Sequence, residues 1–594
     1  MRSATKFFEH LIWFTLFLLL YYTPVLLDIP SSDNFDHRVR YLLDDLLASD
    51  LVRLHLILNV FTHLLLGLLA YVILSAISRN APFVPAESRP AKALILIVGC
   101  FAIMAANQLA FPASNYAVIT YMFGQAEVAA TLISLIIFLS AWSALKSVNI
   151  KNSLIVCFFG VSIFMASSFT PIHRGTSKAS NKESKNIIII GVDSLSYDTF
   201  QGYRQLLPNL NRLFSSSWEF SRAYTPMGRT FPAWTSIFSG LYPADHKAIF
   251  NLRSLNQIDT ENMLPKQLQL MGYETIFALD ERRFNNMDES FGFDTVIGPT
   301  VGALDFLLQK INDTPLTNFV LQSRMAAWLL PYSHQNSAST ANYDADGFVE
   351  NIIHNRRTKN PLFLAAHFES AHFPYKSRHS TLEIDTGNSL FDRHLAALEV
   401  VDRQVGSLMS ALKKTGELNN ALLVVLSDHG ESFGEVEATV RRQDSTIEIM
   451  SFGHGMRLDS RLEQQVVLGL SEFRNGVAVT SPREISTVSS LVEIRAMLEK
   501  YLASGYLGIN PADPCVHMES GILFNGMYEL DKLDVNALIS EAVQHYQVTK
   551  SGLLQIKDES INDLISRKSF GLICKETLTI YNSLSDEFTA YSLD

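Results

Sequence analysis

The sequence predicts two parts: an α-helical transmembrane bundle of about five helices, then an α/β domain with a mostly parallel, doubly wound sheet. The apolar runs that predict the bundle all lie before residue 171. Short β-branched runs that alternate with helical stretches predict the sheet, and they begin at residue 187. The mean hydropathy of +0.14 fits such a mixture, because it is high for a soluble protein and low for a wholly membranous one.

The predicted membrane spans are each close to the ~20 residues that cross a bilayer. The first has no small-residue cleavage site and is followed by four more, which favours a helix over a cleaved signal peptide. Basic residues precede the first span and lie between the second and third and between the fourth and fifth. Positive loops stay cytoplasmic, so the N-terminus is predicted inside and the chain after residue 171 outside. The spans lie near residues 8–27, 56–77, 93–112, 126–145 and 153–170.

Two ionisable residues lie in or at these spans. An ionisable group within a bilayer is a candidate functional residue. We expect His63 to bond to a neighbouring helix. Glu127, at the outer end of its span, either faces headgroup water or has a functional role.

The polar stretch 171–186 contains Pro, Gly and Ser and is predicted to be a linker. It separates a transmembrane domain, 1–170, from an extracytoplasmic domain, 187–594. Continuous apolar runs of the second domain are typical of strands buried on both faces of a parallel sheet. They lie at 187–192, 275–278, 362–367 and 421–426, with helical stretches at 263–271 and 391–415.

Polar side chains follow several of these runs at the point where each predicted strand ends. Asp193 follows the first, the segment from His367 to His372 ends the third, and Asp428 with His429 follows the fourth. Ligands of doubly wound sheets bind beyond the carboxyl ends of the strands. Taken singly, each Asp could equally cap a helix or belong to a turn. Together, carboxylates and an imidazole favour a zinc or manganese site.

A fourth segment, GRTFPAWTS at 228–236, offers a hydroxyl. A threonine hydroxyl needs a metal or a base before it can act as a nucleophile. Placed before a helix, Thr230 would lie where the helix N-terminus attracts an anion. The alternative is that Thr230 only caps a helix that starts with proline.

Several sequence motifs follow one another in the C-terminal part of the chain. They are NIIIIGVDSLSYD at 186–198, PNLNRL at 208–213, Thr-Phe-Pro at 230–232 with Ser-Gly-Leu-Tyr-Pro at 239–243, Gly-Tyr at 272–273, LSDHGE at 426–431 and the stretch 486–497. Any one of them would be a weak signal, but several in order are a strong one. The order is that seen in the alkaline phosphatase/sulfatase superfamily, which the chain resembles over roughly residues 187 to 500.

The resemblance implies a role for each candidate. Asp193, Thr230, Asp428 and His429 match the set that binds a divalent metal, zinc or manganese, with Thr230 as the nucleophile. The remaining candidates match the substrate side, where they could bind phosphate, protonate a leaving group or help to hold a second metal. We expect His372 and His454 to be catalytic, and His367 and Arg229 to bind substrate. The alternatives are ordinary polar contacts, a solvent-facing Arg229, and, for Asp402, a capping or packing role rather than ligation.

Thr230 stands where sulfatases carry a cysteine that becomes formylglycine, and no Cys-x-Pro-Ser-Arg is present. This counts against sulfate ester hydrolysis. With its predicted membrane half, the chain looks like phosphoethanolamine transferases and phosphoglycerol transferases such as lipoteichoic acid synthase. The implied activity is transfer of a phospholipid headgroup onto an envelope glycan or lipid, by a multi-pass protein of a bacterial inner membrane with a periplasmic catalytic domain. The alternatives are a membrane-tethered phosphodiesterase or sulfatase-like hydrolase, and a non-catalytic envelope protein with a degenerate domain.

The formal charge of -11 makes nucleic acid an unfavourable partner. Cys515 and Cys574 could pair outside the cytoplasm or remain thiols, since spacing does not decide connectivity. The chain also departs from the transferases. They usually carry Glu at the position of Asp193, and they match neither 435–450 nor the region after residue 500.

Overall fold

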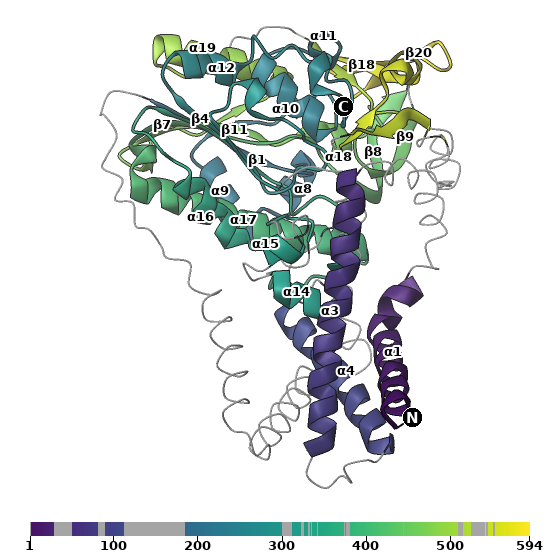
Figure 1. The fold of residues 1–594 in the computed structure, drawn as a ribbon. Coiled ribbons are helices and arrows are strands. Elements are labelled where there is room, and N and C mark those ends of the chain that lie inside the picture. The colour runs from purple at the N-terminus through teal and green to yellow at the C-terminus, as the bar shows by residue number, and fades with distance from the viewer. Residues whose placement is uncertain are drawn as a thin grey trace.

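Figure 1 shows the computed structural model, in which three N-terminal helices extend away from an α/β domain. The structure describes residues 2–28, 50–80, 89–111, 114, 185–299, 312–321, 326–330, 333, 336–340, 343–373, 375, 380–442, 445–508, 515–523, 541, 544–550 and 553–593.

The N-terminal helices are α1 (Arg2–Asp28), α3 (Asp50–Asn80) and α4 (Arg89–Ala110), which pack on one another through buried aromatic and aliphatic side chains. Two stretches of the described chain are long and apolar enough to cross a bilayer, Arg53–Ser78 and Arg89–Gln108. These two helices could anchor the chain, so the five-span prediction is supported for two spans. The first predicted span lies in α1, which is not one of the two. The last two spans, Glu127 and residues 171–184 lie outside the described residues.

The main sheet has nine strands in the order β13-β2-β11-β7-β1-β6-β4-β5, with β12 beside β11. Its centre is parallel, but β11 runs antiparallel to both β7 and β2. The sheet is therefore mixed, although most of its strand pairings are parallel. The strands are β1 (Asn186–Val192), β2 (Trp218–Phe220), β4 (Glu274–Leu279), β5 (Thr295–Ile297), β6 (Leu362–Phe368), β7 (Asn420–Ser427), β11 (Leu468–Arg474), β12 (Val477–Ala478) and β13 (Arg483–Ile485).

Helices cover both faces of this sheet, as Figure 1 shows. Alternate side chains of β1 explain why, since Ile188 and Ile190 pack into one core while Ile187 and Ile189 pack into the other. Every residue of β1 is buried, as its run of isoleucines predicts. The first core is closed by α9 (Pro208–Phe214), α16 (Ala345–His354) and α17 (Ser389–Thr415), and the second by α10 (Thr230–Ser239), α12 (Leu264–Leu270) and α19 (Ile494–Ser504).

Helix α17 shows how local sequence sets these elements. The Asn388 side chain accepts hydrogen bonds from the amides of Leu390 and Phe391, and the helix ends at Gly416, whose φ is +86°. Within it, Asp402 accepts hydrogen bonds from the backbone amides of Asn209 and Leu210 at the start of α9. The prediction that Asp402 caps a helix is confirmed.

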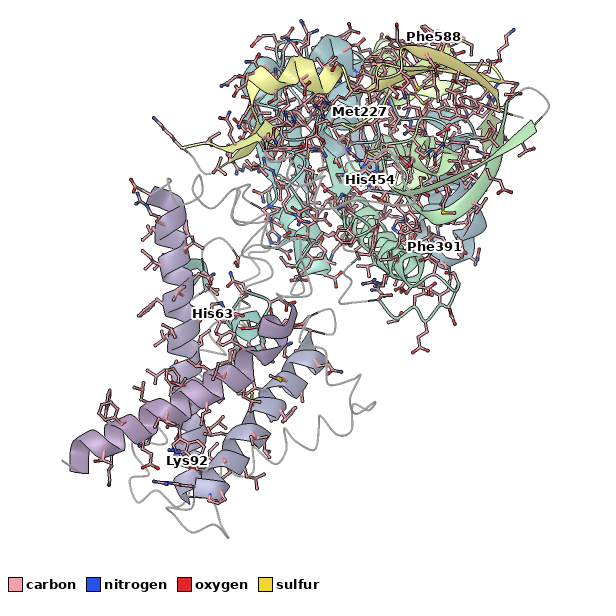
Figure 2. The ribbon with its side chains drawn as sticks, turned by 90° about the vertical axis from the view of Figure 1, so that its right-hand side faces the viewer. His63, Lys92, Met227, Phe391, His454 and Phe588 are labelled. Carbon is pink, nitrogen blue, oxygen red and sulfur yellow. A yellow bond between two sulfur atoms is a disulfide. The ribbon has the colours of Figure 1, made fainter. Side chains whose placement is uncertain are left out.

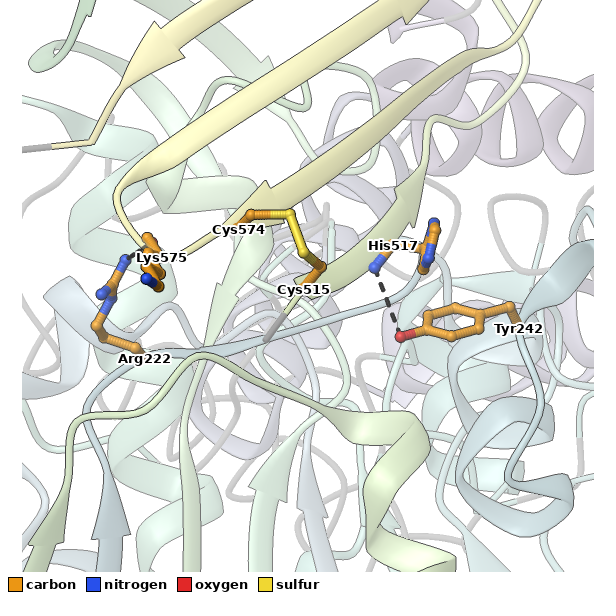
Figure 3. Close-up of a disulfide and its surroundings, with 6 residues drawn as sticks. All are labelled: Arg222, Tyr242, Cys515, His517, Cys574 and Lys575. Carbon is orange, nitrogen blue, oxygen red and sulfur yellow. Dashed lines mark hydrogen bonds between the residues drawn. A yellow bond between two sulfur atoms is a disulfide. The ribbon is translucent and has the colours of Figure 1, made fainter. Parts of the chain in front are cut away.

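A second sheet has six strands in the order β15-β18-β19-β20-β8-β9. It joins the 435–450 insertion to the region after residue 500. These are the two segments that the transferases do not match. Cys515 and Cys574 lie opposite each other in this sheet and form a disulfide, shown in Figure 3. The strands are β8 (Ser432–Arg442), β9 (Ser445–Gly453), β15 (Cys515–Glu519), β18 (Ser569–Cys574), β19 (Thr577–Asn582) and β20 (Glu587–Ser592).

Short elements complete the described chain. The strands are β3 (Ala223–Tyr224), β10 (Gln465–Val466), β14 (Ser489–Ser490), β16 (Tyr546–Val548) and β17 (Leu554–Ile556). The α-helices are α8 (Tyr197–Gly202), α11 (Pro243–His246), α14 (Pro315–Leu321), α15 (Ala326–Leu329), α18 (Arg461–Gln464) and α21 (Ile561–Ile565). The 3-10 turns are η1 (Arg204–Leu206), η2 (Leu255–Gln257), η3 (Glu289–Phe291), η4 (Glu417–Asn419), η5 (Leu491–Glu493) and η6 (Asp558–Ser560).

The stretch that contains α14, between β5 and α16, packs against the N-terminal helices. His63 bonds to Tyr22 of α1 at 2.8 Å and to Asn312 at 3.0 Å, so the prediction that it bonds to a neighbouring helix is confirmed. Figure 2 places His63 at this junction. We call the following buried and half-buried polar residues the inter-helix cluster: Tyr21, Tyr22, Asn59, His63, Asn107, Ser114, Asn312, Asp313, Thr314, Thr317 and Asn318.

Candidate metal and catalytic site

The carboxyl ends of the adjacent strands β6, β1 and β7 bring most of the predicted site residues together. Asp193 directly follows β1, His367 is the penultimate residue of β6, and Asp428 and His429 directly follow β7. The parallel register aligns these ends, because Val192 of β1 lies opposite Phe368 of β6 and Ser427 of β7. We call Asp193, Thr230, His367, Asp428 and His429 the strand-end cluster.

The side chains of the strand-end cluster converge on the Oδ2 atom of Asp193. His367 Nε2 lies 3.4 Å from this atom, Thr230 Oγ1 3.4 Å and His429 Nε2 4.0 Å. Asp428 Oδ2 lies 3.5 Å from each of the two imidazole nitrogens. All five residues are at most 1% exposed, so their charges and dipoles interact with little screening by water.

Thr230 is the first residue of α10, and Arg229 occupies the N-cap position. The Thr230 hydroxyl bonds to Asp193 and caps no backbone amide of the helix in this structure. Trp234, one turn later, packs edge to face on the His367 ring at 5.1 Å. Only glycine fits at position 191 beneath them, because a Cβ there would lie 2.5 Å from Trp234 and 2.6 Å from His367 Nδ1.

Several buried atoms of the site have no hydrogen-bond partner in the described chain. They include the Nε2 atoms of His367 and His429 and Oδ2 of Asp428. Buried polar atoms are normally bonded, so a set of unbonded carboxylate and imidazole atoms suits a divalent cation. Two sets place their ligand atoms within 4.8 Å of one another: Asp193 with Asp428 and His429, and Asp193 with His367 and Glu369.

The electrostatics of the site agree with this fit. Burial raises the pKa of Asp193, but the nearby His429, His372 and His367 outweigh it and hold that pKa well below its usual range. Burial raises the pKa of Glu369 well above its ordinary value. Asp193 and Glu369 therefore lie in one candidate metal set, where the charged form of Asp193 is favoured and that of Glu369 is disfavoured. A bound cation would favour the charged form of both carboxylates.

A second group of side chains, His372, Glu431 and His454, lies beside the strand-end cluster. His454 Nδ1 lies 2.8 Å from Glu431 Oε2, and its ring stacks on that of His429 with centroids 4.1 Å apart. The His372 ring lies 5.3 Å from that of His454. Burial of Glu431 raises its pKa, but His454, His372 and His429 bring the pKa down to about 2. Burial lowers the pKa of His454 to about 4, so its imidazole is neutral at pH 7.

The model of the sulfatase family matches residues 185–485, just over half of the chain. The chain belongs to the sulfatase family. Enzymes of the sulfatase and alkaline phosphatase type use divalent metals, which agrees with the unbonded ligand atoms of the strand-end cluster.

Individual relatives of this sulfatase-family chain are distant. Arylsulfatase J of Mus musculus is 28% identical over 176 residues, which span 28% of each chain. A phosphonate monoester hydrolase of Agrobacterium radiobacter is 15% identical, with 69% of this chain and 89% of that chain covered and a TM-score of 0.43. The lipoteichoic acid synthase LtaP from Listeria monocytogenes is 13% identical, with 59% and 79% covered and a TM-score of 0.36.

Arg229 lies beside Thr230 in the chain, but its side chain points elsewhere. It is half-buried and donates to the backbone carbonyl of His454 and, at 3.0 Å, to Met456 Sδ. This differs from the solvent-facing alternative, and among the described residues no hydrogen bond joins Arg229 to the strand-end cluster. Its substrate-binding role stays a prediction.

Two acidic residues of the site, Glu369 and Glu431, were not among the predicted site residues. Glu431 ends the LSDHGE motif, so its closeness in sequence to Asp428 and His429 could have singled it out. Glu369 lies between His367 and His372, and Glu369 Oε1 has no hydrogen-bond partner among the described residues. A carboxylate two residues after His367 on a strand would point to the same face, which could have singled it out.

Proposed function

We propose that the chain is a metal-dependent phosphotransferase in which Thr230 is the nucleophile. It would move a phospholipid headgroup, phosphoethanolamine or phosphoglycerol, onto a cell-envelope glycan or lipid. One observation carries the proposal: the Thr230 hydroxyl lies 3.4 Å from Asp193 Oδ2, among buried ligand atoms that have no hydrogen-bond partner among the described residues. An isolated helix cap would not need such surroundings.

The identity of the nucleophile favours phosphoryl over sulfuryl transfer. The chain has threonine at this position and lacks the Cys-x-Pro-Ser-Arg motif, so formylglycine chemistry is not open to it. Thr230 also begins α10, whose N-terminus favours a negatively charged group. Both features suit a phosphodiester.

Asp193, Thr230, Asp428 and His429 would hold a zinc or manganese ion, and His367 adjoins them at 3.4 Å from Asp193. A bound cation would lower the pKa of the Thr230 hydroxyl and offset charge on the phosphoryl oxygens. The charge state of these residues suits that task, since the pKa of Asp193 lies well below its usual range.

The reaction would proceed in two displacements. Thr230 Oγ1 passes its proton to His454 or His372 as it attacks phosphorus, an O–P bond forms, and the bond to the diacylglycerol oxygen breaks. The same imidazole then delivers that proton to the departing oxygen. In the second displacement an acceptor hydroxyl passes its proton to this imidazole as it attacks the phosphothreonine, the bond from phosphorus to Thr230 Oγ1 breaks, and the imidazole returns the proton to the Thr230 oxygen. Glu431, 2.8 Å from His454 Nδ1, would orient that ring.

The proposed setting is the inner membrane of a bacterium. A transmembrane domain, 1–170, would cross it five times with the N-terminus inside, and a linker, 171–186, would lead to a periplasmic catalytic domain, 187–594. The apolar helices α3 and α4 and the positive loops between predicted spans support this arrangement. A membrane anchor keeps the enzyme near a lipid donor and a surface acceptor.

A hydrolase is the second candidate, and the family match favours it. Water would replace the acceptor hydroxyl in the second displacement, giving a membrane-tethered phosphodiesterase or sulfatase-like enzyme. A non-catalytic envelope protein is disfavoured by the complete strand-end cluster, because unbonded buried charges destabilise a fold unless they bind a ligand.

One experiment separates these functions. Full-length protein in detergent is incubated with headgroup-labelled phospholipids and envelope extract, with zinc or manganese, and the label is followed by mass spectrometry. Label on a glycan or lipid supports transfer, release to water alone supports hydrolysis, and no reaction with either metal refutes both enzymatic functions. Thr230→Ala should lose at least about 10³-fold in turnover while keeping its melting temperature. Thr235→Ala, which removes a buried hydroxyl that bonds only within α10, is the matched control.

A further inference from the structure

We propose that Arg229 is a positioning residue that holds the loop at 453–457, the His454 loop, against the strand-end cluster. Gly521, in the region after residue 500, completes this support. The inference rests on the proposed function, because His454 is assigned a proton-transfer role there. It replaces the expectation that Arg229 binds substrate. It also gives the second sheet a part in the catalytic site.

Two of the three hydrogen bonds that Arg229 donates to described residues lead to the loop that carries His454. Nη1 donates to the carbonyl oxygens of His454 and, at 3.3 Å, of Gly228, and Nη2 donates to Met456 Sδ at 3.0 Å. Among the described residues these are the only acceptors of its guanidinium. A charged fork held in this way fixes the direction of a carbonyl more firmly than a neutral donor would.

Two glycines let the loop approach the segment before the nucleophile. A Cβ on Gly228 would lie 2.7 Å from Gly455 Cα, and a Cβ on Gly455 would lie 2.2 Å from the Gly228 carbonyl oxygen. Gly455 also has φ +71°, a conformation that disfavours other residues. The two backbones are therefore in direct contact, so Thr230 and His454 are held at a fixed separation.

The second sheet reaches the same point from the other side. The Gly521 amide donates to the Gly455 carbonyl at 2.6 Å, and the Glu519 amide donates to the Pro226 carbonyl at 2.9 Å. A Cβ on Gly521 would lie 3.1 Å from both Arg229 Nη2 and the Gly455 oxygen. Gly521 follows β15, which the disulfide joins to β18 (Figure 3). This support lies outside the family match at 185–485.

The ring of His454 is fixed at its other end by Glu431 and by the stack on His429. The backbone on the far side of the loop is fixed by Glu463, whose Oε2 accepts from the amides of Met456 at 2.7 Å and Arg457 at 3.0 Å. Loss of the Arg229 contacts would therefore let the His454 carbonyl turn while leaving the rest of the loop attached. A small displacement of that kind affects proton transfer more than substrate affinity.

The two roles of Arg229 predict different kinetics. A residue that binds a phosphoryl oxygen contributes to the affinity for substrate and for inorganic phosphate. A residue that positions His454 contributes to kcat, because its effect appears where the proton moves. Arg229→Lys keeps the positive charge but loses the fork, so it tests the geometry without leaving a large cavity.

The test uses full-length Arg229→Lys in detergent, with Arg253→Lys as the matched control. Arg253 is buried, and it joins the region after residue 500 through Asp558 at 2.6 Å, away from His454. We expect Arg229→Lys to lower kcat by about 10 to 100-fold, to leave KM and the inhibition constant of phosphate within about twofold, and to speed amide hydrogen exchange in 453–457. A rise in KM and weaker phosphate inhibition with kcat intact would overturn the proposal, as would unchanged exchange.

Gly521→Ala tests the contribution of the second sheet. It should lower kcat by about threefold to tenfold and speed exchange in 453–457. Its control is Gly571→Ala, whose Cβ would lie 3.3 Å from the flexible ends of Leu458 and Met518. If Gly521→Ala lowers kcat and speeds exchange no more than Gly571→Ala does, the second sheet has no part in positioning His454. Should the wild-type chain show no turnover, the proposed function fails, but the exchange data still decide whether Arg229 and Gly521 hold the loop.

Discussion

The molecule contains two buried polar clusters, and they differ in how completely the chain satisfies them. In the inter-helix cluster, His63 bonds through both ring nitrogens, and Asp313 accepts from Ser114 at 2.6 Å and from Asn318 at 2.9 Å. In the strand-end cluster, the Nε2 atoms of His367 and His429 have no hydrogen-bond partner in the described chain. A satisfied cluster fixes one packing arrangement, whereas an unsatisfied one costs stability until a ligand binds.

The difference suggests separate tasks for polar residues of the same kind. The inter-helix cluster joins α1, α3 and α4 to the stretch that contains α14, so it sets how the N-terminal helices meet the α/β domain. The strand-end cluster keeps its unbonded atoms among packed aromatic and aliphatic side chains, which exclude the water that could otherwise bond to them. The same substitution, aspartate to asparagine, should therefore act differently in the two places.

The largest effect is expected from Asp428→Asn in the strand-end cluster. Turnover should fall at least about 10³-fold, because a ligand of the proposed cation is weakened. Stability without metal should stay the same or rise, because the change removes a buried charge whose Oδ2 has no hydrogen-bond partner among the described residues. Turnover assays and melting temperatures with a chelator and with added zinc provide the measurement.

Added zinc should raise the melting temperature of the wild-type protein through mass action and should hardly change that of Asp428→Asn. Equal zinc stabilisation of both proteins would show that Asp428 is not a ligand. Wild-type turnover in the variant would remove the strand-end cluster from the chemistry.

The two clusters also differ in how well the sequence predicts them. Asp193, Asp428 and His429 could be singled out because each follows a continuous apolar run, and buried parallel strands align their ends. The inter-helix cluster gives no such signal, since Asn107 and Asn318 are 211 residues apart and no periodicity links them. Only the bond from His63 to a neighbouring helix was expected.

The strands of the fold also differ in how well the sequence predicts them. β1, β4, β6 and β7 lie within a residue or two of their predicted bounds, because strands buried on both faces have continuous apolar sequences. The antiparallel β11 has the sequence LGLSEFR, which interrupts its apolar residues with Ser, Glu and Arg, so it was not predicted. The second sheet pairs β8 with β20 across a long stretch of sequence, and its half-buried strands carry no comparable run.

Glu463 is intermediate between the two clusters, because only one of its carboxyl oxygens is hydrogen-bonded. Its Oε2 accepts from two backbone amides, but its Oε1 has no partner among the described residues. Burial raises the pKa of Glu463 to about 7 from an ordinary 4.5. Below pH 4.5 the group is protonated whether the chain is folded or unfolded. Between pH 4.5 and 7 the unfolded chain releases the proton first, so stability falls as pH rises and then levels off above pH 7.

Glu463→Gln should remove that fall, which amounts to about 3 kcal/mol from the size of the pKa shift. Melting temperatures at pH 5 and pH 8 measure it: the variant should lose less stability between the two values than the wild-type protein. Identical pH dependence in both proteins would show that the half-bonded carboxyl carries no such penalty. The buried but fully bonded Asp402→Asn serves as the comparison variant.

The smallest effect is expected from Asp313→Asn, the counterpart of Asp428→Asn in the inter-helix cluster. The asparagine oxygen can still accept from Ser114 and Asn318, but the bonds lose their ionic character, which costs about 1–2 kcal/mol. We expect a melting temperature a few degrees lower, with turnover and zinc stabilisation unchanged. If Asp313→Asn instead abolishes turnover in a folded protein, the inter-helix cluster acts on the chemistry, and the division of tasks between the two clusters is wrong. If Asp313→Asn leaves the melting temperature unchanged, the complete hydrogen bonding of the inter-helix cluster contributes no measurable stability. The two clusters would then differ only in metal binding.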